Sequence, residues 1–100
     1  DIGHQFPVND ARYLNISSAE LLKEVSEKIK KKGFNVEYVD SVIILEEPKI
    51  APFKDRMRSE IAAALNIGIN NISVKATTQE GIGAIGRGEA LAAYAIACLA

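Results

Sequence analysis

The last quarter of the chain carries residues that could bind phosphate. Lys75–Glu80 has the sequence Lys-Ala-Thr-Thr-Gln-Glu, and Gly86–Glu89 has the sequence Gly-Arg-Gly-Glu, so hydroxyls, carboxylates and a guanidinium gather around glycines. Hydroxyl groups at the end of a strand, before a glycine-rich turn, are well placed to donate hydrogen bonds to phosphate oxygens. Thr77 and Thr78 could equally cap a turn, and the residues alone leave both interpretations open.

Two charged side chains of this region could complete such a site. Glu80, as a bare carboxylate, would repel a phosphate unless a magnesium-type cation lay between them, and otherwise it is an exposed glutamate. Arg87 lies between two glycines, and its planar fork suits a diphosphate or a carboxylate such as Glu89 of a neighbouring chain. An ordinary surface ion pair explains Arg87 equally well. The glycine spacing does not follow a Walker or dinucleotide fingerprint, so those nucleotide folds are not expected.

A second candidate region lies in the middle of the chain. Pro48–Pro52 holds an irregular backbone after a buried strand, and its free N–H and C=O groups could recognise the edge of a base, although a plain strand-to-helix connection is simpler. His4 is the only histidine and Cys98 the only cysteine. This chain therefore cannot supply a zinc site that needs two or three imidazoles, nor a Ser-His-Asp or Cys-His catalytic set.

The composition limits the partners that we expect. One hundred residues with 48% hydrophobic content predict one small globular domain. A net charge of -1 gives no diffuse field for nucleic acid or an anionic membrane. No charged-then-apolar leader opens the chain, and the apolar stretch Ala90–Ala100 is too short to span a bilayer as a helix, so we expect a soluble protein. We expect Cys98 to be a small core residue in a reducing compartment.

Two stretches have the periodicity of amphipathic helices. A capping box of Ser17 and Glu20 predicts the start of the first helix, and Gly33 predicts its end. Its apolar face is formed by Leu21, Leu22, Val25 and Ile29. Pro52 predicts the first turn of a second helix, which ends at Asn66–Gly68. The buried stripe expected for this second helix is Met57, Ile61, Ala64 and Leu65.

Three other stretches have the character of strands. Phe34–Asp40 alternates and Val42–Leu45 is an apolar, largely β-branched run, which together predict a central strand covered on both faces. Ile69–Ala76 predicts a further strand that runs into the Thr-Thr loop. Glu89–Ala100 is ambiguous, because its alanine and leucine content favours a helix, whereas small residues on both faces suit a strand packed under helices and against another subunit.

Several motifs, in this order and spacing, closely resemble those of the 2-C-methyl-D-erythritol 2,4-cyclodiphosphate synthase family. The motifs are Asp1–Gly3, Phe6-Pro7, Glu47–Lys49, Lys75–Thr78, Glu80 and Gly86–Glu89. The resemblance covers the whole chain and implies an α/β (α+β) fold, with a mixed β-sheet that has helices on one face, in a homotrimer with active sites between subunits. It implies that Glu89–Ala100 is a strand. It also implies that residues 1–100 are the C-terminal portion of a single domain, without the upstream Asp-x-His pair and later His that bind zinc.

The resemblance implies a lyase of non-mevalonate isoprenoid biosynthesis. Such an enzyme cyclises 4-diphosphocytidyl-2-C-methyl-D-erythritol 2-phosphate to the 2,4-cyclodiphosphate and releases CMP. The implied cofactors are zinc and magnesium or manganese, and this chain alone is not expected to turn over without the zinc ligands. The implied partners are the cytidine diphosphate substrate and further copies of the chain, with no nucleic acid and no membrane, in a bacterial cytoplasm or a plastid stroma. A non-catalytic trimeric nucleotide-binding or assembly module is the alternative.

Carried over position by position, the resemblance assigns residues to three parts of the substrate. The methylerythritol and ribose would be lined by Asp1, Ile2, Gly3, Phe6, Pro7, Val8, Asn9 and Asp10. Cytosine would be held through main-chain groups of Leu45, Glu46, Glu47, Pro48, Lys49, Ile50 and Ala51. The diphosphate would be bound by Thr77, Thr78, Gln79 and Glu80. Thr78 would stabilise the transition state, Glu80 would face the magnesium or manganese ion, Arg87 would reach a phosphate near the trimer axis, and Ala84 would line the central cavity.

Overall fold

Local sequence accounts for where the two long helices begin and end. In the computed structural model, which describes all of residues 1–100, α2 spans Ser18–Lys31 and the Ser17 hydroxyl accepts a 3.3 Å hydrogen bond from the Glu20 backbone N–H. The helix α3 spans Lys54–Leu65 and follows a short 3-10 turn, η2 (Ala51–Phe53), that contains Pro52. Asn66 ends α3 in the left-handed conformation, with a φ of 56°. Both predicted helices are confirmed.

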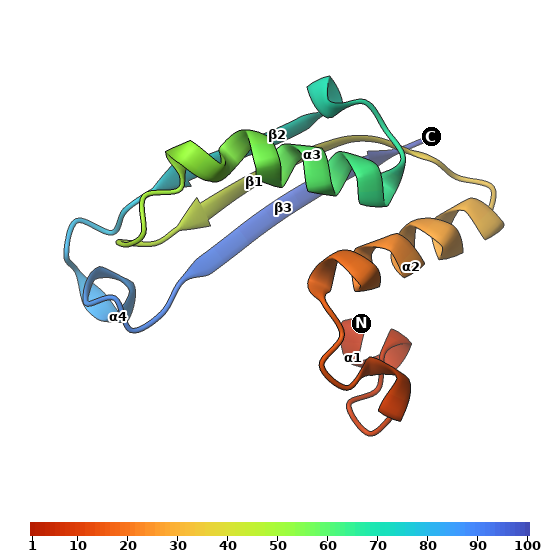
Figure 1. The fold of residues 1–100 in the computed structure, drawn as a ribbon, viewed down its shortest axis with the longest axis horizontal. Coiled ribbons are helices and arrows are strands. Elements are labelled where there is room, and N and C mark those ends of the chain that lie inside the picture. The colour runs from red at the N-terminus through yellow and green to blue at the C-terminus, as the bar shows by residue number, and fades with distance from the viewer.

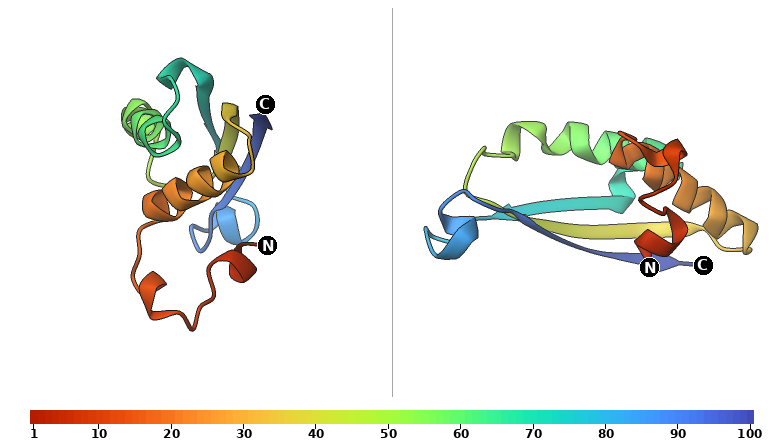
Figure 2. Two further views of the ribbon diagram at one scale, coloured as in Figure 1. Left: turned by 90° about the vertical axis from the view of Figure 1, so that its right-hand side faces the viewer. Right: turned by 90° about the horizontal axis from the view of Figure 1, so that it is seen from below.

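The strands form a mixed three-stranded sheet in the order β2-β1-β3. The central strand β1 (Val36–Ile44) runs parallel to β2 (Ile72–Thr77) and antiparallel to β3 (Ala92–Leu99). Both long helices lie on one side of this sheet and leave its other side open (Figure 2). The predicted fold class, a mixed sheet with helices on one face, is confirmed. No helix is long and apolar enough to cross a membrane.

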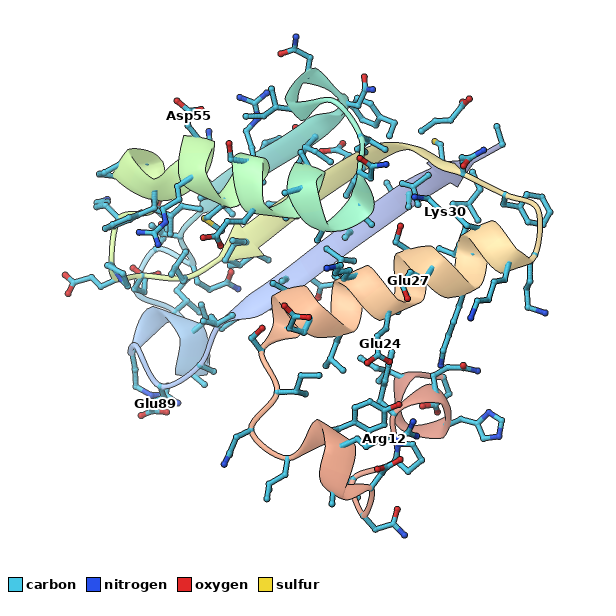
Figure 3. The ribbon with its side chains drawn as sticks, turned by 45° about the vertical axis from the view of Figure 1, so that its right-hand side comes forward. Arg12, Glu24, Glu27, Lys30, Asp55 and Glu89 are labelled. Atoms are coloured by element: carbon cyan, nitrogen blue, oxygen red, sulfur yellow. The ribbon has the colours of Figure 1, made fainter.

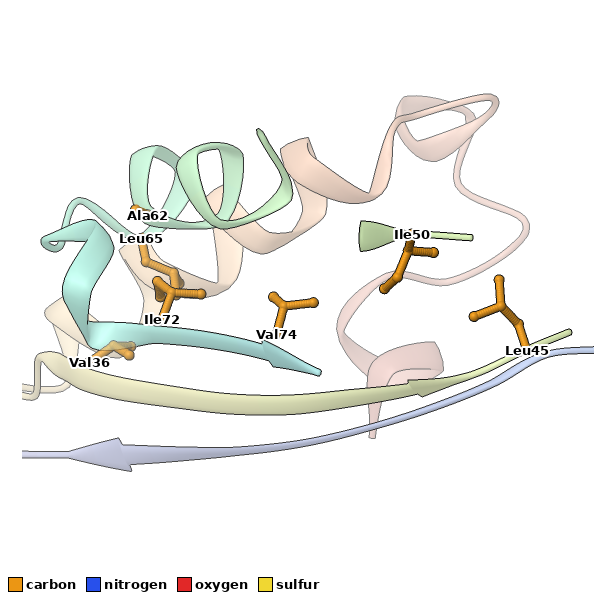
Figure 4. Close-up of a cluster of buried hydrophobic side chains, with 7 residues drawn as sticks. All are labelled: Val36, Leu45, Ile50, Ala62, Leu65, Ile72 and Val74. Carbon is orange, nitrogen blue, oxygen red and sulfur yellow. The ribbon is translucent and has the colours of Figure 1, made fainter. Parts of the chain in front are cut away.

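The hydrophobic core lies between α3 and the sheet (Figure 4). Its buried members are Val36, Leu45, Ile50, Ala62, Leu65, Ile72 and Val74. The predicted stripe of α3 is confirmed at Leu65, which is buried, and at Met57 and Ile61, which pack against the core. Ala64 is only half-buried and the stripe omitted the buried Ala62, so the helix is rotated slightly from the prediction. The core is narrow, because only one side of the sheet is covered.

The last strand settles the ambiguity of Glu89–Ala100. Residues 92–99 form β3 because their backbone groups pair with β1, and this ladder overrides the local helix propensity of alanine and leucine. The expectation that Cys98 is a core residue is wrong, since the residue is exposed. The physical reason is that β3 is an edge strand and Cys98 lies opposite Tyr38, which is itself 41% exposed.

The remaining elements are short turns. The segment before α2 contains α1 (Ile2–Gln5) and the 3-10 turn η1 (Ala11–Tyr13), and it lies beside α2, away from the sheet (Figure 1). The expected strand over Ile69–Ala76 begins later than predicted, because its first three residues form the 3-10 turn η3 (Ile69–Asn71). A one-turn helix, α4 (Gly83–Gly86), lies in the connection between β2 and β3.

Candidate functional site

Two predicted binding segments begin side by side at one edge of the sheet. Ile44 at the end of β1 lies opposite Thr77 at the end of β2, and the Leu45 backbone N–H donates a 3.0 Å hydrogen bond to the Thr77 carbonyl. Parallel strands end at the same edge, where the loops that follow them commonly form binding sites. The parallel pairing therefore brings the loop after β1 next to the Thr-Thr turn, although the two are more than thirty residues apart in sequence.

A pocket of about 190 Å³ lies between these two loops. Its lining residues are Leu45, Glu46, Pro48, Lys49, Ile50, Ala51, Ala76, Thr77 and Thr78. The structure thus brings together six of the seven residues predicted to hold cytosine and both threonines predicted to bind diphosphate. Glu47, Gln79 and Glu80 do not line the pocket and are exposed next to it.

The two threonine hydroxyls differ in their hydrogen bonds. The Thr77 hydroxyl donates to the Thr78 carbonyl at 3.4 Å. The Thr78 hydroxyl oxygen accepts from the Glu80 backbone N–H at 3.3 Å. A hydroxyl has one proton to donate and two lone pairs, so a Thr78 hydroxyl that only accepts within the chain keeps its proton for an outside acceptor. Thr78 is therefore the better placed of the two to donate to a phosphate oxygen.

The Glu46 side chain joins the loop after β1 to the turn after β2. Its Oε1 accepts hydrogen bonds from the backbone N–H groups of Gln79, at 2.7 Å, and Gly81, at 3.4 Å. Glu80, between these two residues, has a φ of 54°, and Gly81 has a φ of 75°. The sequence assigned Glu46 only a main-chain role and gave no signal for this contact, because the parallel pairing that creates it is not local.

The glycine-rich connection folds tightly on itself. A Cβ atom added at Gly86 would lie 2.2 Å from the carbonyl carbon of Gly81, so this approach requires glycine. Arg87 donates from Nε and Nη2 to the two carboxylate oxygens of Glu89, at 3.1 and 3.2 Å. The Arg87 fork is therefore paired with Glu89 of its own chain. Ala84 is exposed on α4.

The residues present match the two expected metals differently. No group of three or more His, Cys, Asp or Glu side chains that could hold a metal ion lies in the structure. Zinc, which takes three or four nitrogen, sulfur or carboxylate ligands from protein, does not fit the residues of this chain. Glu80 is exposed beside the pocket, and one carboxylate together with substrate phosphates is a common ligand set for magnesium. Glu80 therefore fits a magnesium-type ion only when a phosphate is also bound.

The predicted residues of the first segment lie elsewhere. Ile2, Gly3, Phe6, Pro7 and Val8 contribute to a separate pocket of about 410 Å³, next to the start of α2. Arg12 in this segment and Glu89 in the glycine-rich connection lie in different parts of the molecule (Figure 3). Within one chain, the structure does not bring the first segment to the pocket between Leu45–Ala51 and the threonines.

Several side chains of the first segment are engaged within it. Phe6 is 7% exposed, and its ring contacts Tyr13 edge-on with centroids 5.1 Å apart. The Asp1 carboxylate accepts from the Gly3 backbone N–H at 2.8 Å. Arg12 donates to Asp10 at 2.7 Å, and this side-chain hydrogen bond lowers the pKa of the Asp10 carboxyl. Asn9 and Val8 are exposed.

Comparison with known proteins identifies the family. A model described as the YgbB family matches residues 1–100. The chain belongs to the YgbB family. Two curated relatives carry the name 2-C-methyl-D-erythritol 2,4-cyclodiphosphate synthase: one from Alkaliphilus oremlandii is 50% identical over 99% of this chain, and one from Carboxydothermus hydrogenoformans is 49% identical over 96% of it. The chain spans 63% and 59% of these two relatives, which is less than two thirds of their length.

Solved structures of other proteins share the fold. The bifunctional IspDF from Campylobacter jejuni is 38% identical with a TM-score of 0.93, and the match covers 99% of this chain and 27% of that chain. A structure of IspF from Plasmodium falciparum, described as a CDP complex, is 34% identical with a TM-score of 0.82 and covers 99% of this chain and 58% of that chain. The family resemblance stated from the motifs is confirmed.

Proposed function

We propose that the protein carrying this chain is a 2-C-methyl-D-erythritol 2,4-cyclodiphosphate synthase, and that residues 1–100 are part of its single domain. Its substrate is 4-diphosphocytidyl-2-C-methyl-D-erythritol 2-phosphate. An oxygen of the 2-phosphate bonds to the β-phosphorus, the bond from this phosphorus to the bridging oxygen breaks, and CMP leaves with the electron pair. The family membership and the synthase names of the curated relatives support this reaction.

The observation that carries the proposal is the pocket between the loop after β1 and the Thr-Thr turn. The backbone of 45–51 forms one wall and Thr77 and Thr78 form the other. A cytosine bound through main-chain groups of the first wall would direct its diphosphate towards the hydroxyls of the second. The CDP complex of the Plasmodium falciparum protein supports a cytidine diphosphate as the ligand class.

Within this site, we assign the transition-state donor to Thr78. Negative charge builds on the oxygens around the β-phosphorus as the new bond forms, and a hydroxyl that is already oriented stabilises that charge. Thr77, Gln79 and Glu80 bind the diphosphate, and Glu80 would hold a magnesium or manganese ion together with it. Divalent metals would offset phosphate charge when bound. The zinc ligands come from outside residues 1–100.

The site is completed by a neighbouring copy of the chain. We infer this because the sugar-binding segment lies apart from the pocket within one chain, so Asp1–Gly3 and Phe6–Asp10 of one protomer would line the pocket of the next. The open side of the sheet exposes two large apolar side chains of β3, with Tyr94 64% and Ile96 70% exposed. A homotrimer would cover them and place Arg87 and Ala84 near its axis.

Light scattering of the full-length protein should give three times the monomer mass. For its location we propose the cytoplasm of a bacterium, or the plastid stroma if the organism bears plastids.

The test of the proposed function is Thr78→Ala in the full-length protein. We expect kcat for CMP release to fall by about 100-fold or more, because one preorganised donor to developing charge typically contributes this much. CDP affinity should change little, since the donor acts chiefly in the transition state. The matched control is Ser59→Ala, which removes an exposed hydroxyl from α3, away from the pocket.

Turnover and binding together decide the outcome. A loss of CDP affinity with unchanged kcat would contradict the role of Thr78. A wild-type protein that binds CDP and forms a trimer but releases no CMP would instead support a non-catalytic nucleotide-binding module.

A further inference from the structure

The turn that carries Thr78 has an unusual backbone. Glu80 and Gly81 are both left-handed, with φ values of 54° and 75°. This conformation is disfavoured for a residue with a Cβ atom such as Glu80. Contacts from outside the turn must therefore hold Glu80 in place, because its own backbone preference would not.

Glu46 supplies those contacts. Its Oε1 accepts from Gln79 N at 2.7 Å and from Gly81 N at 3.4 Å, so the two hydrogen bonds flank Glu80 on both sides. The N–H of Glu80 itself donates to the Thr78 hydroxyl oxygen at 3.3 Å. The three successive N–H groups of the turn are thus all satisfied by side-chain oxygens, and the orientation of the Thr78 hydroxyl is linked to the position of Glu46.

We propose that Glu46 is a positioning residue for Thr78. The Glu46 carboxylate holds the backbone of the turn at residues 79–81. The turn in turn positions the Glu80 N–H, which donates to the Thr78 hydroxyl oxygen. The hydroxyl proton of Thr78 is then free to point at the pocket. The proposal rests on the proposed function and deepens it. Glu46 is half-buried two residues beyond the end of β1, and it directly follows Leu45, whose backbone N–H is bonded to the Thr77 carbonyl, so its backbone position is constrained by the paired strands.

The charge of Glu46 is not what this role requires. A free carboxylate beside a diphosphate would repel it, whereas hydrogen bonding to two backbone donors offsets part of that charge. The amide oxygen of glutamine could accept the same two hydrogen bonds without any charge. The role therefore predicts that Glu46→Gln retains activity and that Glu46→Ala does not.

The experiment measures two quantities in the full-length protein for each variant. The first is kcat and KM for CMP release from the cyclase substrate, and the second is hydrogen exchange of the Gln79 and Gly81 amides, which does not depend on activity. For Glu46→Ala we expect kcat to fall about 10-fold or more, because small misplacements of a reacting group are costly, and both amides to exchange faster. Glu46→Gln should restore both quantities to within about 3-fold of the wild type, because it keeps the acceptor oxygen. The matched control is Glu27→Ala, since Glu27 projects from α2 into solvent, and it should change neither quantity (Figure 3).

Each outcome decides a separate point. Fast exchange at Gln79 and Gly81 with unchanged kcat would overturn the positioning role, and so would a Glu46→Gln variant as impaired as Glu46→Ala. Unchanged exchange in Glu46→Ala would overturn the contact itself. A wild-type protein that releases no CMP would contradict the proposed function, and the exchange rates alone would then decide whether Glu46 holds the turn.

Discussion

Residues 45–51 and 77–81 continue directly from two hydrogen-bonded strands, whereas residues 1–16 precede α2, lie away from the sheet and form no backbone hydrogen bond with it (Figure 1). In the first region the backbone pairing of β1 and β2 fixes where the loops begin. In the second region the Lys28 ammonium lies over the Phe6 ring, 4.7 Å from the ring centroid. Lys28 Nζ also donates a hydrogen bond to Gln5 Oε1 at 3.0 Å. The two groups of predicted binding residues are thus held by different kinds of contact.

This difference suits the proposed division of the site. A pocket that must place a diphosphate against a single hydroxyl needs a rigid support, which a strand end provides. A segment that lines the pocket of a neighbouring copy must be able to adjust as copies associate. Regions with few buried contacts open locally at low free-energy cost. We therefore expect residues 1–16 to open independently of the sheet.

The largest expected effect comes from removing one buried side chain in each region. Ile72→Ala should lower the free energy of unfolding by about 2–5 kcal/mol, because Ile72 is only 2% exposed in the core under α3. Phe6→Ala should lower the free energy of unfolding by less than about 1 kcal/mol, although burial of a phenylalanine commonly contributes more. The reason is that its ring contacts Tyr13 of the same segment and the Lys28 side chain of α2, and does not belong to the core under α3. Denaturant unfolding of the full-length protein measures both values.

Hydrogen exchange supplies the control for the variants Ile72→Ala and Phe6→Ala. In Phe6→Ala the amides of residues 1–16 should exchange much faster while those of β1 and β2 remain protected. If Phe6→Ala and Ile72→Ala lower the global free energy of unfolding equally, the first segment is part of the cooperative core and the contrast between the regions is wrong.

The parts of the fold that were predictable from sequence are those with local causes. The hydroxyl of Ser17 and the left-handed Asn66 act within a few residues of the helix ends that they mark, so both helices were located correctly. The strand at 92–99 was not decided by its own composition, because the deciding interaction is its ladder with β1, and only the family resemblance resolved it. Cys98 was misplaced for a related reason: apolar content does not reveal which strand lies at an edge.

The candidate site divides in the same way. The threonines and the loop after β1 were recognisable as motifs, whereas the contact of Glu46 with Gln79 depends on the parallel pairing of distant strands. Arg58 was missed for the same reason, although its guanidinium donates to the carbonyls of Ile72 at 2.9 Å and Ile69 at 3.0 Å and so ties α3 to the start of β2. Long-range hydrogen bonds of this kind leave no periodic signal in the sequence.

A smaller effect is expected when the tether of the first segment is removed. Lys28→Met keeps most of the apolar stem but loses both the ammonium over the Phe6 ring and the hydrogen bond to Gln5. We expect the local opening free energy of residues 1–10 to fall by about 0.5–1 kcal/mol. Hydrogen exchange of these amides measures it. Lys23→Met, at an exposed position of α2, is the matched control, and an equal effect of the two variants would show that Lys28 is not a specific tether.

The smallest expected effect is a pH dependence that differs between the two regions. The hydrogen bond from Arg12 holds the pKa of the Asp10 carboxyl below its ordinary value of 3.8. The hydrogen bond from Lys75 likewise lowers the pKa of the Asp40 carboxyl, and this ion pair joins β1 to β2. A carboxyl whose pKa is lower in the folded state stabilises that state at pH values above its ordinary pKa, and this stabilisation is lost as the pH falls through the lowered value.

Below about pH 4 we therefore expect residues 10–16 to open locally as Asp10 is protonated, and the sheet to lose global stability as Asp40 is protonated. Asp10→Asn should remove the pH dependence from amide exchange of residues 10–16 only. Asp40→Asn should remove part of the pH dependence of the global free energy of unfolding, because the ion pair of Asp40 with Lys75 joins two core strands. NMR titration of the two carboxyl carbons assigns each transition. If both variants change the same global transition by the same amount, the two regions unfold as one unit, and the separation inferred from their contacts does not hold.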